Sequence, residues 1–200
     1  IIVTVLFACL IGSALLFYAG WELIIVGLLC VLFAFLYTTG PYPLSYNGWG
    51  DVLVIVFFGF VPVGGTYYVQ ALTWTSDTTV ASLICGLLID TLLVVNNYRD
   101  READARSGKR TVIVRFGEKF GRYLYLMLGV AASLLCFWFF FEGHMFAALL
   151  PLLYLIPHVL TWRRMVQIHS GKKLNSILGE TSRNMLLMGI LLSIGFLIRH

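Results

Sequence analysis

Seven long apolar runs divide the sequence, and each has about the length that an α-helix needs to cross a lipid bilayer. They cover roughly residues 1–19, 21–39, 51–71, 79–98, 122–141, 145–164 and 184–199. A spanning helix takes about 20 predominantly apolar residues. The composition agrees, since 60% of the residues are hydrophobic and 12% are charged,. The pattern therefore predicts an all-α integral membrane protein built as a bundle of about seven transmembrane helices.

The basic residues lie in two segments that share one side of the membrane if every apolar run crosses it. Of the 14 Lys and Arg residues, eight lie from Arg99 to Arg122 and five from Arg163 to Arg183. Because basic loops stay in the cytoplasm, we expect a multi-pass protein of the cell (inner) membrane with both segments on the cytoplasmic side. The net charge of +4 reflects this topology. We expect membrane lipid around the bundle and no nucleic-acid partner.

Polar and charged residues replace the apolar ones abruptly at the end of the fourth run, in the segment 96–115. If the helix continues through this segment, Asn97, Asp100 and Asp104 share one face, because residues three, four and seven apart are neighbours on a helix. Two carboxylates four residues apart can hold Mg²⁺ jointly, while substrate phosphates and water complete its coordination shell. The spacing favours a site for Mg²⁺ and a diphosphate.

Two bases, Lys109 and Arg110, follow these acids. Such side chains form charge-assisted hydrogen bonds with phosphate oxygens, so we expect both to meet the same diphosphate. The alternative is a charged loop that anchors a membrane helix at the lipid headgroups, which is the commoner role of such a segment. The repeated acids on one helix face favour the diphosphate site.

A further carboxylate, Asp90, lies in the middle of the fourth run. A charge at that depth costs roughly 2.5–3.5 kcal/mol on insertion scales, so it normally faces a cavity or a partner. The helical repeat places Asp90, Asn97 and Asp104 within about 40° of one another. We expect the acidic site to continue inward as a polar-lined cavity. The alternative is a structural carboxylate, protonated or hydrogen-bonded between helices.

Aromatic residues of the third run, Tyr67 and Tyr68, are candidates for a catalytic role. Aromatic rings attract a cation through their quadrupole, so rings near a diphosphate site would suit an allylic cation. The alternative is an aromatic belt at the membrane interface.

A proline- and glycine-rich segment, 41–50, joins the second and third runs without a single base. Its composition predicts extended and turn-rich structure. It would serve either as a lid over the site or as a plain connector, and the spacing does not distinguish the two.

A pattern of carboxamides, acids and bases runs through the segment 96–111. It reads Asn96-Asn97-Tyr98-Arg99-Asp100, then Asp104, and then Gly108-Lys109-Arg110-Thr111. This pattern resembles the second aspartate-rich motif of the UbiA intramembrane prenyltransferases, in the form found in the branch that prenylates 1,4-dihydroxy-2-naphthoate for menaquinone synthesis. Segments 37–44 and 57–70 are similar to the same branch. The resemblance covers essentially the whole chain, which we interpret as one UbiA-type transmembrane domain, residues 1–200.

The resemblance implies a fold of nine spans with two aspartate-rich motifs. The seven apolar runs of this chain are similar to the third to ninth of those spans. The first motif, of the NDxxDxxxD type, is not in the sequence. We therefore expect a C-terminal fragment without the N-terminal spans, and we expect it to be inactive alone.

The resemblance also implies a reaction. Mg²⁺ held by Asp100 and Asp104 would neutralise the diphosphate of a polyprenyl diphosphate. The polyprenyl group would pass to a ring carbon of 1,4-dihydroxy-2-naphthoate, with loss of CO₂ and diphosphate, to give demethylmenaquinone. The implied residues are Arg99, Lys109 and Arg110 for the diphosphate, Asp90 and Asn96 for the cavity, and Asp100, Asp104, Asn97, Tyr67 and Tyr68 for catalysis.

Two alternatives stay open at this point. One is a prenyltransferase of the same family with another aromatic acceptor, because the metal site does not decide acceptor choice. The other is a non-enzymatic seven-span receptor or transporter, in which Asp90 would be an ion or ligand site. The carboxylate pair beside Lys109 and Arg110 favours the enzyme.

Overall fold

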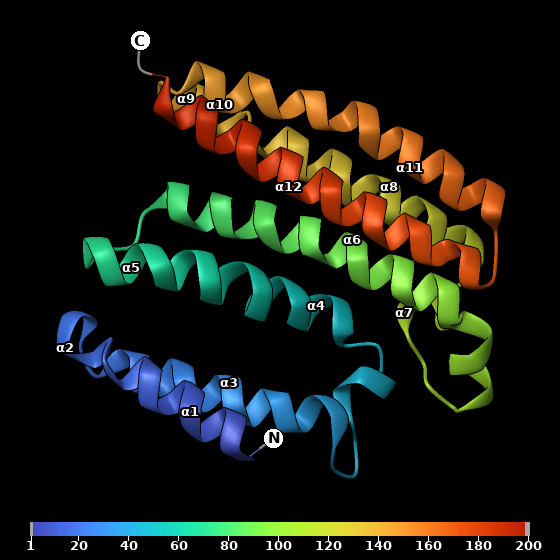
Figure 1. Cartoon of the computed structure of the whole chain (residues 1–200), viewed down its shortest axis with the longest axis horizontal. Coiled ribbons are helices and arrows are strands. Elements are labelled where there is room, and N and C mark those ends of the chain that lie inside the picture. The colour runs from blue at the N-terminus through green and yellow to red at the C-terminus, as the bar shows by residue number, and fades with distance from the viewer. Residues whose placement is uncertain (1, 199–200) are drawn as a thin grey trace.

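The computed structural model describes residues 2–198, and this part of the chain contains helices and no strand (Figure 1). The chain is an all-α integral membrane protein, as predicted. Five helical segments are long and apolar enough to cross a membrane: Gly50–Ala71, Ser76–Arg106, Glu118–Phe141, Met145–Ile168 and Lys172–Leu197.

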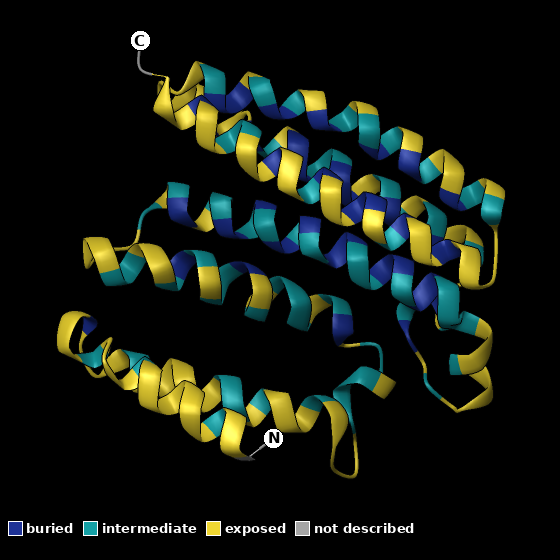
Figure 2. Ribbon diagram, in the orientation of Figure 1, coloured by how far each residue is buried: buried dark blue, intermediate teal, exposed yellow. Residues whose placement is uncertain are grey.

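The first two predicted spans are shorter helices than the sequence suggested. α1 (Ile2–Ser13) has 12 residues, α2 (Leu16–Ala19) is a single turn, and α3 (Glu22–Thr38) has 17 residues. All residues of α3 are at least partly exposed, and Figure 2 shows these helices as largely exposed at the lower edge of the bundle. The prediction of seven spans rests on the length of the apolar runs alone. This length does not reveal the break at Ala14 and Leu15, which divides the first run into two short helices.

The third span is bent around a wide helical turn. It comprises α4 (Gly50–Val54), a π-helical stretch η2 (Ile55–Gly64) and α5 (Gly65–Ala71). Pro62 lies inside the π-helical stretch, where its missing N–H and its ring disturb the ordinary hydrogen-bond ladder. A 3₁₀ turn, η1 (Leu44–Tyr46), precedes the span in the loop that follows α3.

The longest helix, α6 (Ser76–Arg106), lies at the centre of the bundle, between η2 on one side and α8 (Glu118–Leu135) on the other. Its 31 residues span about 46 Å,. Thr75 caps its start by accepting a hydrogen bond from the N–H of Thr78 at 3.2 Å,. The helix continues beyond its apolar part into the charged segment, as predicted.

The contact between η2 and α6 is a backbone contact. A Cβ atom on Gly59 would lie 2.5 Å from the carbonyl oxygen of Ser82 and 2.8 Å from the Cα atom of Gly86. Small residues allow such close helix approach in membranes. The antiparallel pair is therefore held in one longitudinal register.

The second half of the chain completes the bundle. α9 (Trp138–Phe141) and α10 (Met145–Leu149) form the turn after α8, and η3 (Leu150–Tyr154) leads into α11 (Leu155–Ile168). η4 (Lys172–Leu174) then leads into α12 (Asn175–Leu197). These helices pack on α6 through a core that includes Val94, Val95, Tyr98, Ile113, Tyr125, Met165 and Ile177.

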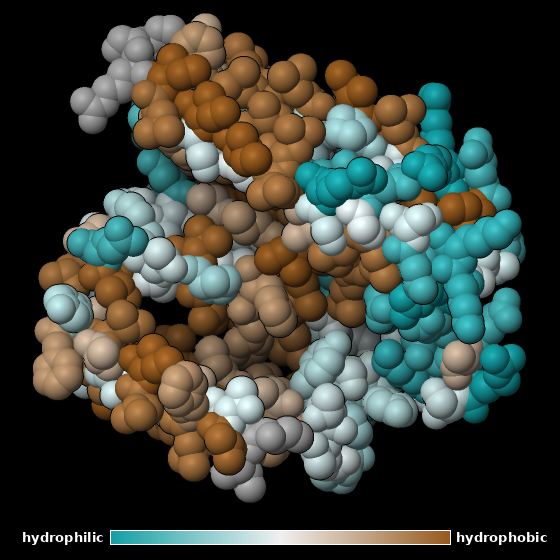
Figure 3. All heavy atoms as spheres, viewed as in Figure 1, coloured by the Kyte–Doolittle hydropathy of each residue, from teal (hydrophilic) through white to brown (hydrophobic). Residues whose placement is uncertain are grey.

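The two basic segments lie at the same end of the bundle, as predicted. The end of α6, the short helix α7 (Val112–Phe116), the start of α8 and the α11–α12 connection meet there. Figure 3 shows hydrophilic residues gathered at this end and hydrophobic residues along the flanks. We call this the basic end.

Candidate functional site

The last turns of α6 carry a tight ion-pair network. Arg99 donates to both carboxylate oxygens of Asp100, from Nε to Oδ1 at 2.8 Å and from Nη2 to Oδ2 at 2.6 Å. The same guanidinium donates to Oδ1 of Asn96 at 2.7 Å and to Oδ1 of Asn175, at the start of α12, at 2.9 Å. Arg99 therefore links α6 to α12 and fixes the Asp100 carboxylate, while Asn96 serves as a partner of Arg99.

The second acid of the motif, Asp104, contacts the segment that follows α6. Lys109 Nζ is 3.5 Å from Asp104 Oδ2, and the backbone N–H of Lys109 donates to the carbonyl of Asp104 at 2.9 Å. Gly108, with φ of 77°, makes the turn that returns the chain,. The Asp104 Oδ2 atom is buried and lacks a hydrogen-bond partner among the described residues. Asp104 and Lys109 thus form an ion pair in which the Oδ2 atom of Asp104 accepts no hydrogen bond from the described residues.

A small polar pocket opens beside this ion pair. Its free volume, about 10 Å³, is enough for one water molecule or one hydroxyl group and too small for an aromatic ring,. Asn97 lines it from α6 and is 4% exposed. The other lining residues come from α3, the loop 39–49, α4 and the segment after α6: Tyr37, Ser45, Gly48, Gly50, Asp51, Lys109 and Thr111.

One residue of this pocket, Asp51, was not among the predicted site residues. It lies in the first turn of α4, and its Oδ1 atom is buried without a hydrogen-bond partner in the described part of the chain. Its position gave a signal that could have found it. An acid directly after a glycine-rich loop, at the start of an apolar run, marks a carboxylate at the membrane boundary on the same side as the basic segments.

Asp90 lies deeper in the bundle than the motif. It is 1% exposed, and its Oδ1 atom has no hydrogen-bond partner within residues 2–198. Seven residues, or about 10 Å along α6, separate it from Asn97,. Asp90 is not among the residues that line the small pocket, so the inward continuation of the acidic site as far as Asp90 stays a prediction.

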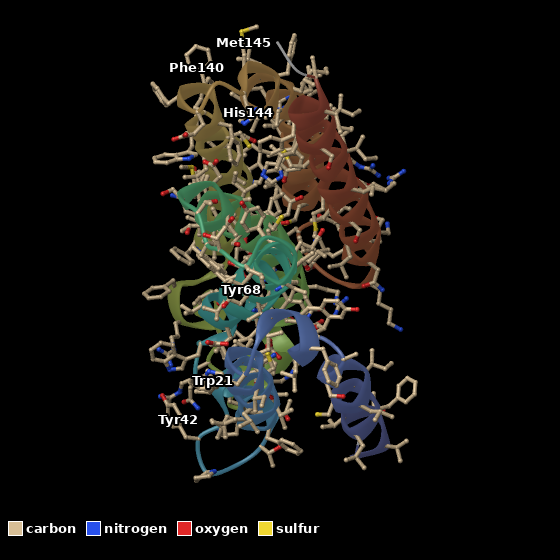
Figure 4. The ribbon with its side chains drawn as sticks, turned by 90° about the vertical axis from the view of Figure 1, so that its left-hand side faces the viewer. Trp21, Tyr42, Tyr68, Phe140, His144 and Met145 are labelled. Carbon is tan, nitrogen blue, oxygen red and sulfur yellow. The ribbon has the colours of Figure 1, made fainter. Side chains whose placement is uncertain are left out.

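The structure does not bring Tyr67 or Tyr68 to this site. Gly59 packs at the level of Ser82 and Gly86, so α5 lies beside the first turn of α6. That level is about 30 Å from Asn97 along the helix axis. Figure 4 looks onto this opposite end, with Tyr68 in the middle of the view, Trp21 below it and Phe140 at the top.

These tyrosines therefore fit the alternative of an interfacial aromatic belt. Their predicted place beside the acids was wrong, because the prediction took no account of the antiparallel register that separates the two ends. The two ends of a helix as long as α6 lie at opposite sides of the membrane, and the tyrosines lie at one end and the acids at the other.

The loop 39–49 packs over the charged segment. The backbone N–H of Arg110 donates to the carbonyl of Tyr46 at 2.7 Å, and Arg115 Nη2 donates to the carbonyl of Asn47 at 2.7 Å. Gly48, with φ of 80°, would carry a Cβ atom 3.0 Å from the carbonyl oxygen of Arg110. The loop is thus a cover on the pocket and not a plain connector. The side chain of Arg110 itself is exposed.

The donor atoms of the site suit a hard cation, although the carboxylates are not gathered into one cluster. Among residues 2–198, three or more His, Cys, Asp or Glu residues are nowhere placed to share a metal ion. Asp104 and Asn97 nevertheless offer oxygen atoms, which Mg²⁺ prefers, and Mg²⁺ needs only one or two protein carboxylates when phosphates complete its shell. The two oxygens of Asp100 are bound to Arg99.

Comparison with known proteins gives a consistent family match. Residues 1–194 match the family described as "UbiA prenyltransferase family". A 1,4-dihydroxy-2-naphthoate octaprenyltransferase of Haemophilus influenzae is 38% identical over 181 residues, which cover 86% of this chain and 56% of that protein. The Escherichia coli protein of the same name is 39% identical over 142 residues, covering 68% of this chain and 46% of the relative.

More distant relatives belong to the same group. A UbiA prenyltransferase domain-containing protein 1 of Dictyostelium discoideum is 30% identical over 162 residues, which cover 81% of this chain and 48% of that protein. No solved structure matches the chain. The chain spans about half the length of the curated relatives it matches. With its helical membrane fold and its family match over almost the whole length, the chain belongs to the UbiA prenyltransferase family.

Proposed function

We propose that the protein to which this chain belongs transfers a polyprenyl group from a polyprenyl diphosphate to 1,4-dihydroxy-2-naphthoate in menaquinone synthesis, with loss of CO₂ and diphosphate. The observation that carries the proposal is the convergence of Asp100, Asp104 and Lys109 at one polar end of α6. The names of the relatives support the naphthoate acceptor. They give no support to the alternative of a seven-span receptor or transporter.

Asp100 and Asp104, in the last turns of α6, would hold Mg²⁺ in the proposed site. Asp104 would contribute its Oδ2 atom, which is buried, accepts no hydrogen bond from the described residues and lies 3.5 Å from Lys109 Nζ, and Asp100 would contribute a carboxylate that Arg99 keeps in a fixed orientation. When bound, the ion supplies positive charge that stabilises the diphosphate as it leaves. Both carboxylates lie on one helix face, which suits a shared ion.

Basic side chains at the same end would bind the diphosphate. Lys109 already lies 3.5 Å from Asp104, so a phosphate next to this acid would meet the ammonium group as well. Arg99 has one edge of its guanidinium on Asp100, and Arg110 is exposed in the loop next to Lys109. Charge-assisted bonds of this kind contribute roughly 1.5–3 kcal/mol each.

The membrane supplies the setting for the reaction. The basic end faces the cytoplasm in this proposal, following the excess of Lys and Arg there. A long isoprenoid tail would lie in the apolar part of the bundle, where water is scarce and an allylic cation is protected. The naphthoate ring would attack this cation from the pocket side.

A chimaera tests this function. The chimaera joins this chain to the part of the Haemophilus influenzae relative that precedes the matched region. We expect it to prenylate 1,4-dihydroxy-2-naphthoate in membranes when Mg²⁺ is present. We expect no prenylation of 4-hydroxybenzoate, and none by the chain alone. Equal rates with both acceptors would overturn the assignment of 1,4-dihydroxy-2-naphthoate as the acceptor. No product with either, while the relative itself is active, would overturn the activity.

A further inference from the structure

The starting point is an orphaned carboxylate in the polar pocket. Asp51 Oδ1 has less than 1 Å² of exposed surface and accepts no hydrogen bond from residues 2–198. A buried polar atom without a partner is costly, and native structures rarely retain one without a reason. The reason is either a structural partner or a ligand.

Structural partners do not account for Asp51. The pocket contains a base, Lys109, but its ion pair is with Asp104 at 3.5 Å. Among the described residues, no three His, Cys, Asp or Glu residues are placed to share a metal ion. Asp90, a buried acid of α6, is not among the residues that line the pocket. The donor that would satisfy Asp51 therefore comes from outside the described residues, as a water molecule or as a hydroxyl group of a ligand.

The pocket is built to hold such a group in place. Its walls come from segments far apart in sequence. The position of a Cβ on Gly50 would be 3.5 Å from the hydroxyl of Tyr37, so α3 closes on the start of α4. Asn97 is buried in α6, and Thr111 caps α7 by accepting from the N–H of Val114 at 3.3 Å. The free space admits one hydroxyl-sized group,.

We propose that Asp51 accepts a hydrogen bond from a ring hydroxyl of the aromatic acceptor and so orients the ring at the mouth of the pocket. This rests on the proposed function, because it takes the acceptor class from there. An ionised carboxylate only accepts hydrogen bonds, and of the two proposed substrates the naphthoate alone carries O–H donors. The diphosphate of the donor is anionic and is repelled by Asp51.

The role of Asp51 is that of a binding and positioning residue. A hydrogen bond from the hydroxyl to a carboxylate leaves more electron density on the aromatic ring, which favours attack on an allylic cation. Charge-assisted hydrogen bonds are roughly twice as strong as neutral ones. Asn97 and Lys109 line the same pocket, and Asp104 pairs with Lys109, so the ring would be held next to the proposed diphosphate site.

Binding to the chain itself tests the inference. We would measure anisotropy of naphthoate fluorescence, under argon and in lipid nanodiscs, with 1,4-dihydroxy-2-naphthoate and with 1,4-dimethoxy-2-naphthoate, which lacks the O–H donors. We expect Asp51→Leu to weaken binding of the dihydroxy compound by about ten- to a hundredfold and to leave the dimethoxy compound unchanged. Asp51→Asn, which keeps a neutral oxygen acceptor, should lie between.

The control is Asp77→Asn, the same chemical change at the opposite end of α6, where Asp77 accepts from Trp138 Nε1 at 2.8 Å. It should bind both compounds as the wild type does. Equal weakening of both compounds by Asp51→Leu, no weakening of either, or no binding by the wild type would each overturn the inference.

Turnover by the chimaera separates this inference from the proposed function. We expect Asp51→Asn to raise KM for the naphthoate by about tenfold and to leave KM for the polyprenyl diphosphate unchanged. A rise confined to the diphosphate would move Asp51 to the metal site and overturn the inference. A wild type that discriminates between the two naphthoates but forms no product would contradict the proposed function instead.

Discussion

Arg99 holds both oxygens of the Asp100 carboxylate, at 2.8 Å and 2.6 Å, although the two residues are neighbours in the sequence. The pair is half-buried near the end of α6, where Arg99 also reaches Asn175 on α12. Under the proposed function, a metal ion bound at Asp100 would share this carboxylate with Arg99. Ligand binding there would then be tied to the contact between α6 and α12.

The two motif acids are expected to be essential. Asp100→Ala or Asp104→Ala should lower kcat of the chimaera by at least about a hundredfold. Each change removes a carboxylate that would bind Mg²⁺, and the charge of this ion would stabilise the leaving diphosphate. Glu102→Gln, an exposed acid in the same turn, is the matched control and should retain activity. Rates near the wild type in both alanine variants would remove these acids from the mechanism.

Lys109 is expected to act on the donor and not on the acceptor. Lys109→Ala should raise KM for the polyprenyl diphosphate by roughly tenfold, since it removes one charge-assisted bond. Lys109→Arg keeps the charge and should recover part of the loss. Steady-state kinetics with each substrate varied in turn will decide, and an effect confined to the naphthoate would reassign the residue.

The glycine contact between η2 and α6 predicts a stability effect. Gly59→Ala should lower the free energy of unfolding by about 1–3 kcal/mol or more, because its Cβ would meet the backbone of Ser82 and Gly86, which cannot turn aside,. Gly65→Ala, whose Cβ would have nothing within 4 Å, should change little. Thermal unfolding in detergent is the measurement, and similar midpoints for the two variants would contradict the packing.

The hydrogen bond that holds the loop 39–49 over the pocket should limit the mobility of this loop. Arg115→Ala removes the hydrogen bond to the carbonyl of Asn47 and should speed proteolytic cleavage of this loop in vesicles several-fold. Arg106→Ala, an exposed base at the end of α6, provides the control. Unchanged cleavage after the Arg115 change would show that the backbone bond from Arg110 to Tyr46 suffices.

Much of the fold could be predicted from the sequence because the determinants are local. Apolar length and the placement of bases predicted the all-α membrane bundle and the shared basic end. Helical spacing predicted that Asn97, Asp100 and Asp104 follow one another on α6. Each of these properties depends on residues close together in the chain.

The rest depended on contacts between distant segments. Asp51 meets Asn97 only because α3, α4 and α6 converge, and no periodicity in the sequence reports that convergence. Tyr67 was placed with the acids because its span was known but its register against α6 was not. Asp100 is predicted as a metal ligand, and the sequence does not reveal that Arg99 bends back onto it.

The close approach of Gly59 to α6 has a consequence for the pocket, which lies about 12 Å away along α4 and η2. If one helix slid past the other by a single turn, Asp51 would move by about 5.4 Å relative to Asn97, and the two would no longer share a cavity. Under the proposed function, the geometry of the substrate pocket would therefore depend on a helix–helix contact among small residues outside that pocket.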